Sequence, residues 1–288
     1  MLVQKYFAPR TTEEACDLLS RYKDEARIIC GGTDLVVRMK HGEISPKYII
    51  NIGNIAEQDY ITYDDKRGLS LGALATINSI MSAPVIREKF GILAQATSQL
   101  GTRQIRNRAT IGGNLCNAAS SAETAPPLIV LGARAKIVGS GGQRTVAMES
   151  FFTGPRQTTL KADEILVEIQ VPNLPRSGGV YLKHTIRKAL DLAIVGVAVL
   201  VTMVGDTIND VKIALGAVAP TPIRAKKAEE ILKGQRIDDD LLEKAGQAAS
   251  DESRPIDDVR ASADYRRKMV NVLVRRAIKQ AVAQVKAG

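Results

Sequence analysis

The order of hydrophobic and polar residues predicts alternating helices and short strands at the start of the chain. Residues 12–21 place apolar side chains at helical spacing behind two acidic residues, which predicts an amphipathic helix. The apolar run 26–30 is short enough for a strand and ends at the pair Gly31-Gly32, which allows a tight turn. A further helix is expected to begin near Asp34, so the pattern predicts a strand, a glycine turn and a helix.

Mixed elements continue through the first 171 residues. Short runs of β-forming residues between turn residues predict strands at 47–52, 61–63, 68–74, 133–138 and 164–171. Helical spacing predicts two helices within 83–100, separated near Gly91, and one at 124–131 with two prolines in its first turn. The intermixing of helices and strands indicates an α+β fold.

The segment 172–179 combines prolines and glycines between two apolar strand patterns, which is typical of a linker. We therefore place a domain boundary between residues 174 and 175. Beyond it, three successive strands are predicted at 180–186, 193–204 and 207–218, and three helices at 224–232, 239–249 and 263–285. The expected arrangement is an antiparallel meander with helices packed on one face.

Composition places the chain among globular proteins. Of its 288 residues, 45% are hydrophobic and 25% are charged, so disordered and fibrous classes are disfavoured. The longest apolar stretch, 192–204, is too short to span a membrane as a helix. The N-terminal segment lacks the apolar core of a secretory signal, so a cytoplasmic location is expected.

The cysteines and the net charge narrow the chemistry further. Cys16, Cys30 and Cys116 are too widely spaced for a structural zinc or an iron–sulfur cluster, so we expect reduced thiols and no metal in this chain. The formal charge of +9 suggests nucleic acid, but the chain has only 4% aromatic residues and no tryptophan to stack on bases. Solvated helices or an acidic partner subunit explain the charge better.

Two glycine stretches are the strongest candidate for chemistry. They run from Gly31 to Asp34 and from Thr110 to Asn114, and neither matches a Rossmann or a P-loop pattern. Glycines expose backbone N–H groups, and a helix that begins beside them adds aligned donors. Two such stretches can hold one diphosphate between them, although each glycine pair taken alone is more typical of a structural turn.

The residues around these stretches resemble a known family. Segments 28–35 and 104–115 resemble the two FAD-binding signatures of the flavin subunit of the xanthine dehydrogenase and carbon monoxide dehydrogenase family. Segments 6–19, 222–234 and 262–269 resemble further parts of the same subunit, in the same order. The resemblance covers nearly the whole chain, and five ordered matches are more specific than any one of them.

The resemblance implies a fold and a division into domains. Residues 1–174 are expected to form a two-lobed α+β FAD-binding domain of the vanillyl-alcohol-oxidase (PCMH) type, with lobes at about 1–55 and 56–174. Residues 175–288 are expected to form a small C-terminal domain with a three-stranded antiparallel sheet and helices. The flavin is expected to lie between the two domains.

The resemblance also implies the residues that contact FAD. Those in or beside the two signatures are Ile29, Cys30, Gly31, Gly32, Thr33, Asp34, Leu35, Thr110, Ile111, Gly112, Gly113, Asn114 and Ala119, together with Leu166. Glu123 is expected to face the ribityl or ribose hydroxyls, and Lys183 to reach toward the isoalloxazine ring. Neither His41 nor His184 lies in an attachment motif, so non-covalent FAD is expected.

The implied function is electron transfer. By the resemblance, a large partner subunit carries the molybdenum cofactor, a small one carries [2Fe–2S] clusters, and the assembly is a dimer of heterotrimers. This chain would pass electrons from the clusters to an external acceptor, with no catalytic residue of its own. Two alternatives remain open: an autonomous FAD-dependent oxidase, and an adaptor or nucleic-acid-binding protein. The substrate and the acceptor (NAD, quinone, ferredoxin or oxygen) also stay open.

Overall fold

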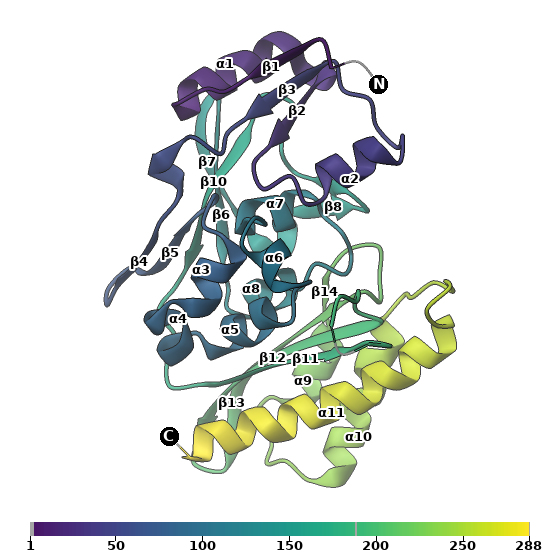
Figure 1. Cartoon of the computed structure of the whole chain (residues 1–288). Helices are drawn as coiled ribbons and strands as arrows, with labels where there is room; N and C mark the ends of the chain where they lie inside the picture. The colour runs from purple at the N-terminus through teal and green to yellow at the C-terminus, as the bar shows by residue number, and fades with distance from the viewer. Residues whose placement is uncertain (1–2, 188, 288) are drawn as a thin grey trace.

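The computed structural model describes residues 3–187 and 189–287. At the N-terminal end, a parallel sheet has the order β1-β3-β2, with strands Lys5–Phe7, Tyr48–Asn51 and Ala26–Ile29 (Figure 1). Helix α1 (Thr12–Tyr22) packs on it and starts where the Thr11 side chain accepts a hydrogen bond from the Glu14 backbone. Helix α2 (Leu35–Lys40) follows the first glycine pair.

The middle of the chain forms a five-stranded antiparallel sheet with the order β4-β5-β10-β6-β7. Its strands are Ile61–Asp64, Gly68–Gly72, Ile165–Val171, Arg134–Gly139 and Gly142–Ala147. Six short helices lie along one face (Figure 1): α3 Ile77–Ser82, α4 Pro84–Lys89, α5 Gly91–Ser98, α6 Arg103–Arg106, α7 Ile111–Cys116 and α8 Ala125–Val130. A small hairpin, β8 (Phe152–Gly154) and β9 (Gln157–Thr158), lies apart from this sheet.

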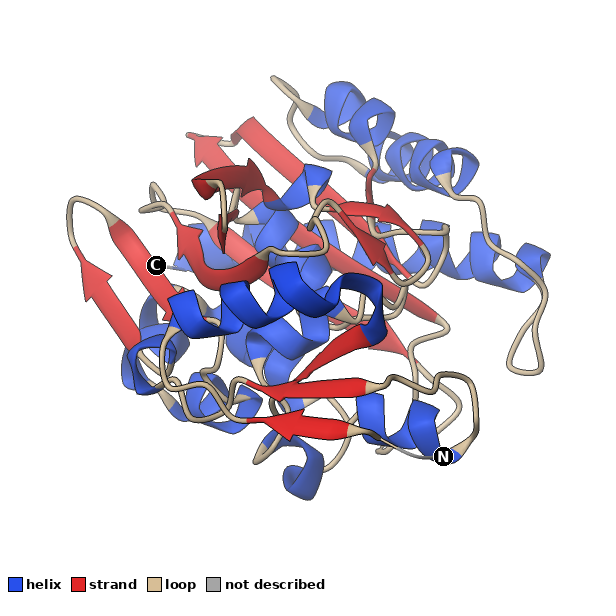
Figure 2. Ribbon diagram, turned by 90° about the horizontal axis from the view of Figure 1, so that it is seen from above, coloured by secondary structure: helices blue, strands red, loops and turns tan. Residues whose placement is uncertain are grey.

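The C-terminal part is an antiparallel sheet with the order β11-β12-β13-β14. Its strands are Gly178–His184, Val195–Val204, Thr207–Gly216 and Ile223–Arg224. Helices α9 (Lys226–Leu232) and α11 (Ala263–Ala287) pack on the strands, and α10 (Asp239–Glu252) packs on α9 and α11. Viewed from above, the strands of the molecule lie in separate sheets with helices between them (Figure 2).

Strand β12 explains how the two halves are joined. Its residues 195–201 are all buried, because both faces of the sheet are covered. Val197, Val199 and Val201 belong to the core under the C-terminal helices, whereas Ala198 and Leu200 belong to the core of the middle region, where α5 and α8 contact the same sheet. The halves therefore share an extensive apolar contact.

Most predicted elements are present within a few residues of their expected limits, including the two helices separated at Gly91. The predicted three-stranded C-terminal sheet has a fourth strand, β14, whose two residues are too few to leave a pattern. Strands β7, β8 and β9 and helices α3, α6 and α7 were not predicted; each has at most six residues. Within the described residues, no helix is long and apolar enough to cross a bilayer.

Candidate functional site

A cavity of about 540 Å³ is lined by both glycine stretches. Its wall includes nearly all of the residues expected to contact FAD: Ile29, Cys30, Gly31, Gly32, Thr33, Asp34, Leu35, Thr110, Gly112, Gly113, Asn114, Ala119, Glu123 and Leu166. These residues come from the end of β2, the start of α2, the start of α7, the segment that precedes α8, and β10. The volume lies within the range of small-molecule and cofactor sites.

The two glycine turns touch each other directly. A Cβ atom on Gly31 would lie 2.0 Å from the carbonyl oxygen of Arg108, so only glycine permits this approach. The Cys30 thiol lies 3.1 Å from the Thr110 hydroxyl, and the Asn117 amide donates to the Asp34 carboxylate at 3.0 Å. Segments about eighty residues apart in the sequence therefore form one wall of the cavity.

The first turn keeps its backbone donors free. The N–H groups of Gly32, Thr33 and Asp34 make no hydrogen bond to any other described residue. Gly32 has a φ of +75°, a left-handed conformation that favours glycine. Unpaired N–H groups beside a cavity are the donors that phosphate oxygens accept. The first turn therefore fits the diphosphate of a dinucleotide cofactor.

In the second turn, the backbone amides are already hydrogen-bonded within the chain. The expectation that they are free is wrong. The N–H groups of Ile111 and Gly112 donate to Ala75 and Ala73 carbonyls, and that of Gly113 donates to the Thr110 hydroxyl at 3.1 Å. A Cβ atom on Gly112 would lie 2.7 Å from the Ala73 carbonyl oxygen. These glycines therefore allow close packing of α7 and leave a side-chain-free surface toward the cavity.

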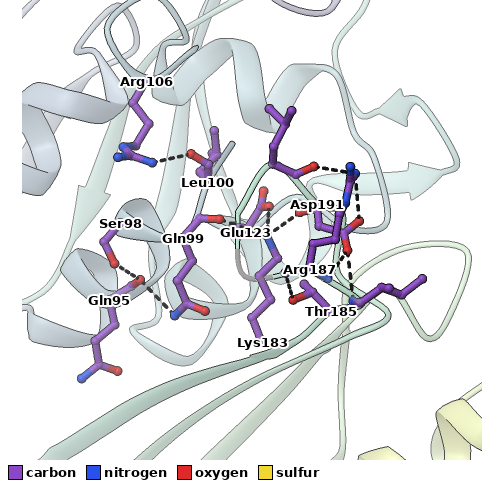
Figure 3. A network of polar contacts seen from close by, with 12 residues as sticks. Gln95, Ser98, Gln99, Leu100, Arg106, Glu123, Lys183, Thr185, Arg187 and Asp191 are labelled. Carbon is purple, nitrogen blue, oxygen red and sulfur yellow. Dashed lines mark hydrogen bonds and ion pairs between the residues drawn. The ribbon is translucent and has the colours of Figure 1, made fainter. Parts of the chain in front are cut away.

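A buried ion pair closes the other part of the site (Figure 3). Lys183 Nζ lies 2.8 Å from Glu123 Oε1, and both side chains are less than one-tenth exposed. The same ammonium group donates to the backbone carbonyls of Gln99 at 3.0 Å and Asp191 at 2.7 Å. Burial raises the pKa of the Glu123 carboxyl, and the Lys183 cation opposes that rise. The pair links β11 to the segment before α8.

Two residues expected to contact FAD, Lys183 and Ile111, are not part of the cavity wall. Lys183 is not part of the cavity wall, and its three donors are already engaged, so it has no free hydrogen to offer a flavin ring. Ile111 is fully buried in the core of the middle region, which leaves only its backbone near the second turn. Lys183 supports the wall through its bond to Glu123, and Ile111 supports it through packing in the core.

Charge around the first turn is balanced locally. Burial raises the pKa of the Asp34 carboxyl, and the cations of Arg156 and Arg38 act against that rise. Arg156, at the tip of the β8–β9 hairpin, also donates to Asn117 at 3.3 Å, and Asn117 donates to Asp34. A chain of polar contacts thus fixes the Asp34 side chain beside the open amides.

Several wall residues were not predicted. They include the cations Lys23, Arg27, Arg38 and Lys161 and the apolar residues Leu100, Ile105 and Leu190. Arg38 could have been inferred, because it lies one helical turn after Asp34. The others lie on separate loops and strand ends, and no spacing in the sequence relates them to the glycine turns.

Cys16, Cys30 and Cys116 are free thiols in the structure. Cys30 and Cys116 line the cavity, and burial raises the pKa of the Cys116 thiol to about 12, which keeps it protonated and unreactive. Across residues 3–187 and 189–287, no group of three or more His, Cys, Asp or Glu side chains could hold a metal ion.

Comparison with known proteins identifies the family. Residues 2–174 match the model described as the FAD binding domain in molybdopterin dehydrogenase. The chain belongs to this family of FAD-binding subunits. Residues 180–281 match the CO dehydrogenase flavoprotein C-terminal domain. The match confirms the family resemblance and the α+β fold class that the sequence predicted. The chain is a subunit of an oxidoreductase.

Individual relatives agree over the full length. The chain is 30% identical to the putative xanthine dehydrogenase FAD-binding subunit of Escherichia coli, over 96% of each chain. It is 33% identical to the glyceraldehyde dehydrogenase medium chain of Sulfolobus acidocaldarius, over 96% of this chain and 97% of that one. A solved carbon monoxide dehydrogenase from Hydrogenophaga pseudoflava matches with a TM-score of 0.95 at 32% identity, over 99% of each chain.

The residues present fit FAD. The open amides of Gly32, Thr33 and Asp34 would hold the diphosphate, and the glycine surface of α7 would allow the cofactor to lie against the backbone. Bound FAD accepts electrons singly and releases them in pairs. The protein contributes the shape of the cavity and the fixed Glu123–Lys183 pair beside it.

Proposed function

We propose that this chain binds FAD non-covalently and relays electrons from [2Fe–2S] clusters on a small partner subunit to an external acceptor. In this proposal a large partner subunit carries the molybdenum cofactor and chooses the substrate. The single observation that supports it most is the cavity in which two glycine turns, eighty residues apart, meet beside three unpaired amides. The named relatives support it too, since several are medium chains or medium subunits of dehydrogenases and hydroxylases.

The finer assignments belong to the same proposal. We propose residues 1–174 as the FAD-binding domain, with lobes of about 1–55 and 56–174, and residues 175–288 as the C-terminal domain. The parallel sheet lies within the first lobe and the five-stranded sheet within the second, which supports these limits. The dimer of heterotrimers is proposed from the family alone. The cytoplasmic location stays a prediction from the sequence.

One experiment separates electron relay from direct oxidation. The chain is purified alone and with its natural partners, and both preparations are mixed without oxygen with xanthine, nicotinate, glyceraldehyde or carbon monoxide, substrates taken from the names of relatives. The proposal expects flavin absorbance near 450 nm in both, bleaching only in the complex, and release of intact FAD on acid precipitation.

The other outcomes favour the alternatives. Bleaching of flavin in the isolated chain would favour an autonomous oxidase that carries its own substrate pocket. A colourless chain that binds no added FAD would favour an adaptor. Binding to DNA with a steep dependence on salt would favour the nucleic-acid function.

A further inference from the structure

The ammonium group of Lys183 joins three segments of the chain that form part of the cavity wall (Figure 3). It donates to Glu123 Oε1 at 2.8 Å, to the Asp191 carbonyl at 2.7 Å and to the Gln99 carbonyl at 3.0 Å. Glu123 and Asp191 line the cavity. Gln99 directly precedes Leu100, which lines it as well. Lys183 itself is not part of the wall, so it acts on all three segments without facing the cavity.

Stability alone does not account for this buried pair. The side chains of Lys183 and Glu123 are 5% and 7% exposed, so both charges have lost most of their hydration. Neutral side chains of similar volume often fill such positions with equal or greater stability. Removal of one partner alone is costly, because the other charge then stays buried without compensation. A need for a carboxylate with a fixed orientation explains the pair better.

The Glu123 carboxylate keeps one oxygen for a ligand. Lys183 occupies Oε1, and no other side chain in the described part of the chain donates to this carboxylate. Because Glu123 belongs to the wall, Oε2 can accept a hydrogen bond from a donor in the cavity. FAD carries hydroxyl groups on both sides of its diphosphate, and the open amides of the first glycine turn lie in the same wall. A hydroxyl group is therefore the donor that we expect at Oε2.

We propose that Lys183 is a positioning residue for the cofactor. It fixes the Glu123 carboxylate so that Oε2 accepts a hydrogen bond from a hydroxyl group of FAD, and it makes no contact with the flavin ring. This inference rests on the proposed function, and it replaces the expectation that Lys183 reaches toward the isoalloxazine. The carboxylate is oriented before the cofactor arrives, so FAD binding does not have to order it.

Two variants separate positioning from mere compensation of charge. In Glu123→Gln, the amide oxygen can still accept from Lys183, so the side chain stays fixed. In Lys183→Met/Glu123→Gln, neither charge of the pair remains, but the substituted side chain has lost its fixed partner. The full chain is stripped of FAD and titrated with it, and flavin fluorescence gives the Kd. We expect a Kd about ten-fold higher for the double variant than for Glu123→Gln, and equal values in the two folded proteins would overturn the proposal.

Lys212→Met is the matched control. Lys212 lies on β13 of the same sheet, is half-buried and is not part of the cavity wall. The same change of side chain should therefore leave the Kd for FAD unchanged. Urea denaturation shows that each variant is folded under the conditions of the titration. An equal loss of affinity in Lys212→Met would mean that any lysine of this sheet has the effect, and would reject a specific role for Lys183.

The pH dependence of Lys183→Met gives an independent readout. The titratable groups around Glu123 are Lys183, the wall residue Asp34 and the buried Tyr181, while backbone N–H groups engage the Asp191 carboxylate. Burial raises the pKa of Glu123 and the Lys183 cation opposes the rise, so loss of that cation raises the pKa further.

FAD brings an anionic diphosphate into the same cavity, so it should bind the protonated form of Glu123 better in this variant. The Kd of Lys183→Met should then rise with pH, by up to about ten-fold per pH unit, because one proton is involved. The double variant cannot titrate at this position and should not show the rise. Parallel pH profiles for Lys183→Met and the double variant would contradict the proposal.

Two further results distinguish a failed inference from a failed function. A full-length unmodified chain that binds no FAD would reject the proposed function and the positioning role with it. A chain that binds FAD, with no difference between Glu123→Gln and the double variant, would reject the positioning role alone. The visible absorption spectrum of bound flavin should be the same in these two variants. A spectral difference would show that Lys183 touches the ring, and would also overturn the inference.

Discussion

The two glycine turns look alike in the sequence and do different things in the structure. The first, at Gly31-Gly32, leaves three neighbouring amides unpaired beside the cavity. The second, at Gly112-Gly113, has its amides bonded to Ala73 and to the Thr110 hydroxyl. The difference teaches that a glycine pair can supply donors, or it can supply only room for a helix to pack.

The two turns should therefore respond differently to substitution. Changes in the first turn beyond Gly31 should weaken FAD binding more than they weaken the fold. Loss of a hydrogen bond in the second turn should weaken the fold and affect FAD only through it, whereas a side chain added at Gly112 or Gly113 would also occupy the surface that faces the cavity. Gly31 itself serves both purposes, because it precedes the open amides and contacts the Arg108 backbone.

The largest effect is therefore expected for Gly31→Ala. The new methyl would lie 2.0 Å from the Arg108 carbonyl oxygen, a backbone atom that cannot rotate away. Overpacking of this kind should cost about 3 kcal/mol or more in the free energy of unfolding and abolish FAD binding. Chemical denaturation and flavin absorbance measure the two effects. Gly141→Ala is the control, since nothing lies within 4 Å of its Cβ position; equal stability of the two variants would contradict the contact between the turns.

A smaller and more specific effect is expected for Gly32→Ala. The methyl meets only side chains at ordinary distances, so the cost comes from the φ of +75° and amounts to about 1 kcal/mol. Relaxation of that strain moves the open amides, and we expect the Kd for FAD to rise about ten-fold, which is about 1.4 kcal/mol. Fluorescence titration with FAD measures it. Unchanged affinity at reduced stability would mean that the first turn is structural as well.

Thr110→Val tests the second turn. Valine keeps the shape of threonine but removes the hydroxyl that accepts from Gly113, so the unfolding free energy should fall by about 1 kcal/mol. Because the amides of this turn are not free, the Kd for FAD should change less than about three-fold, well under 1 kcal/mol. A large loss of affinity without loss of stability would reverse the roles assigned to the two turns.

The smallest effect concerns pH. Burial raises the pKa of Asp34, so the folded chain holds this proton more tightly than the unfolded chain, and stability should fall as pH rises from about 4 toward neutral. Asp34→Asn should remove the contribution of Asp34 to this loss of stability. Melting temperature measured as a function of pH tests it. Asp64→Asn is the opposite control, because backbone hydrogen bonds lower the pKa of Asp64 and its contribution grows with pH. If both variants changed the pH dependence of the melting temperature in the same direction, the opposite pKa shifts of Asp34 and Asp64 would be contradicted.

Sequence alone predicted the local elements well, and the site only in part. Apolar spacing located α1, β12 and α11, because each buries a continuous stripe or run. The convergence of the two turns followed from the family resemblance, since no local rule relates segments eighty residues apart. The engagement of Lys183 by Glu123 and two carbonyls was not predictable, because Glu123 and Gln99 lie 60 and 84 residues away from it in the sequence.

Strand β12 has a consequence for recombining this protein with its relatives. Its alternate side chains pack against helices from both halves, so the surface between them is an internal core and not a detachable joint. A chimera that took its C-terminal half from another member would need compatible side chains on α5 and α8 as well. Exchanging the C-terminal half alone would leave mismatched apolar layers on the face of β12 that packs against α5 and α8.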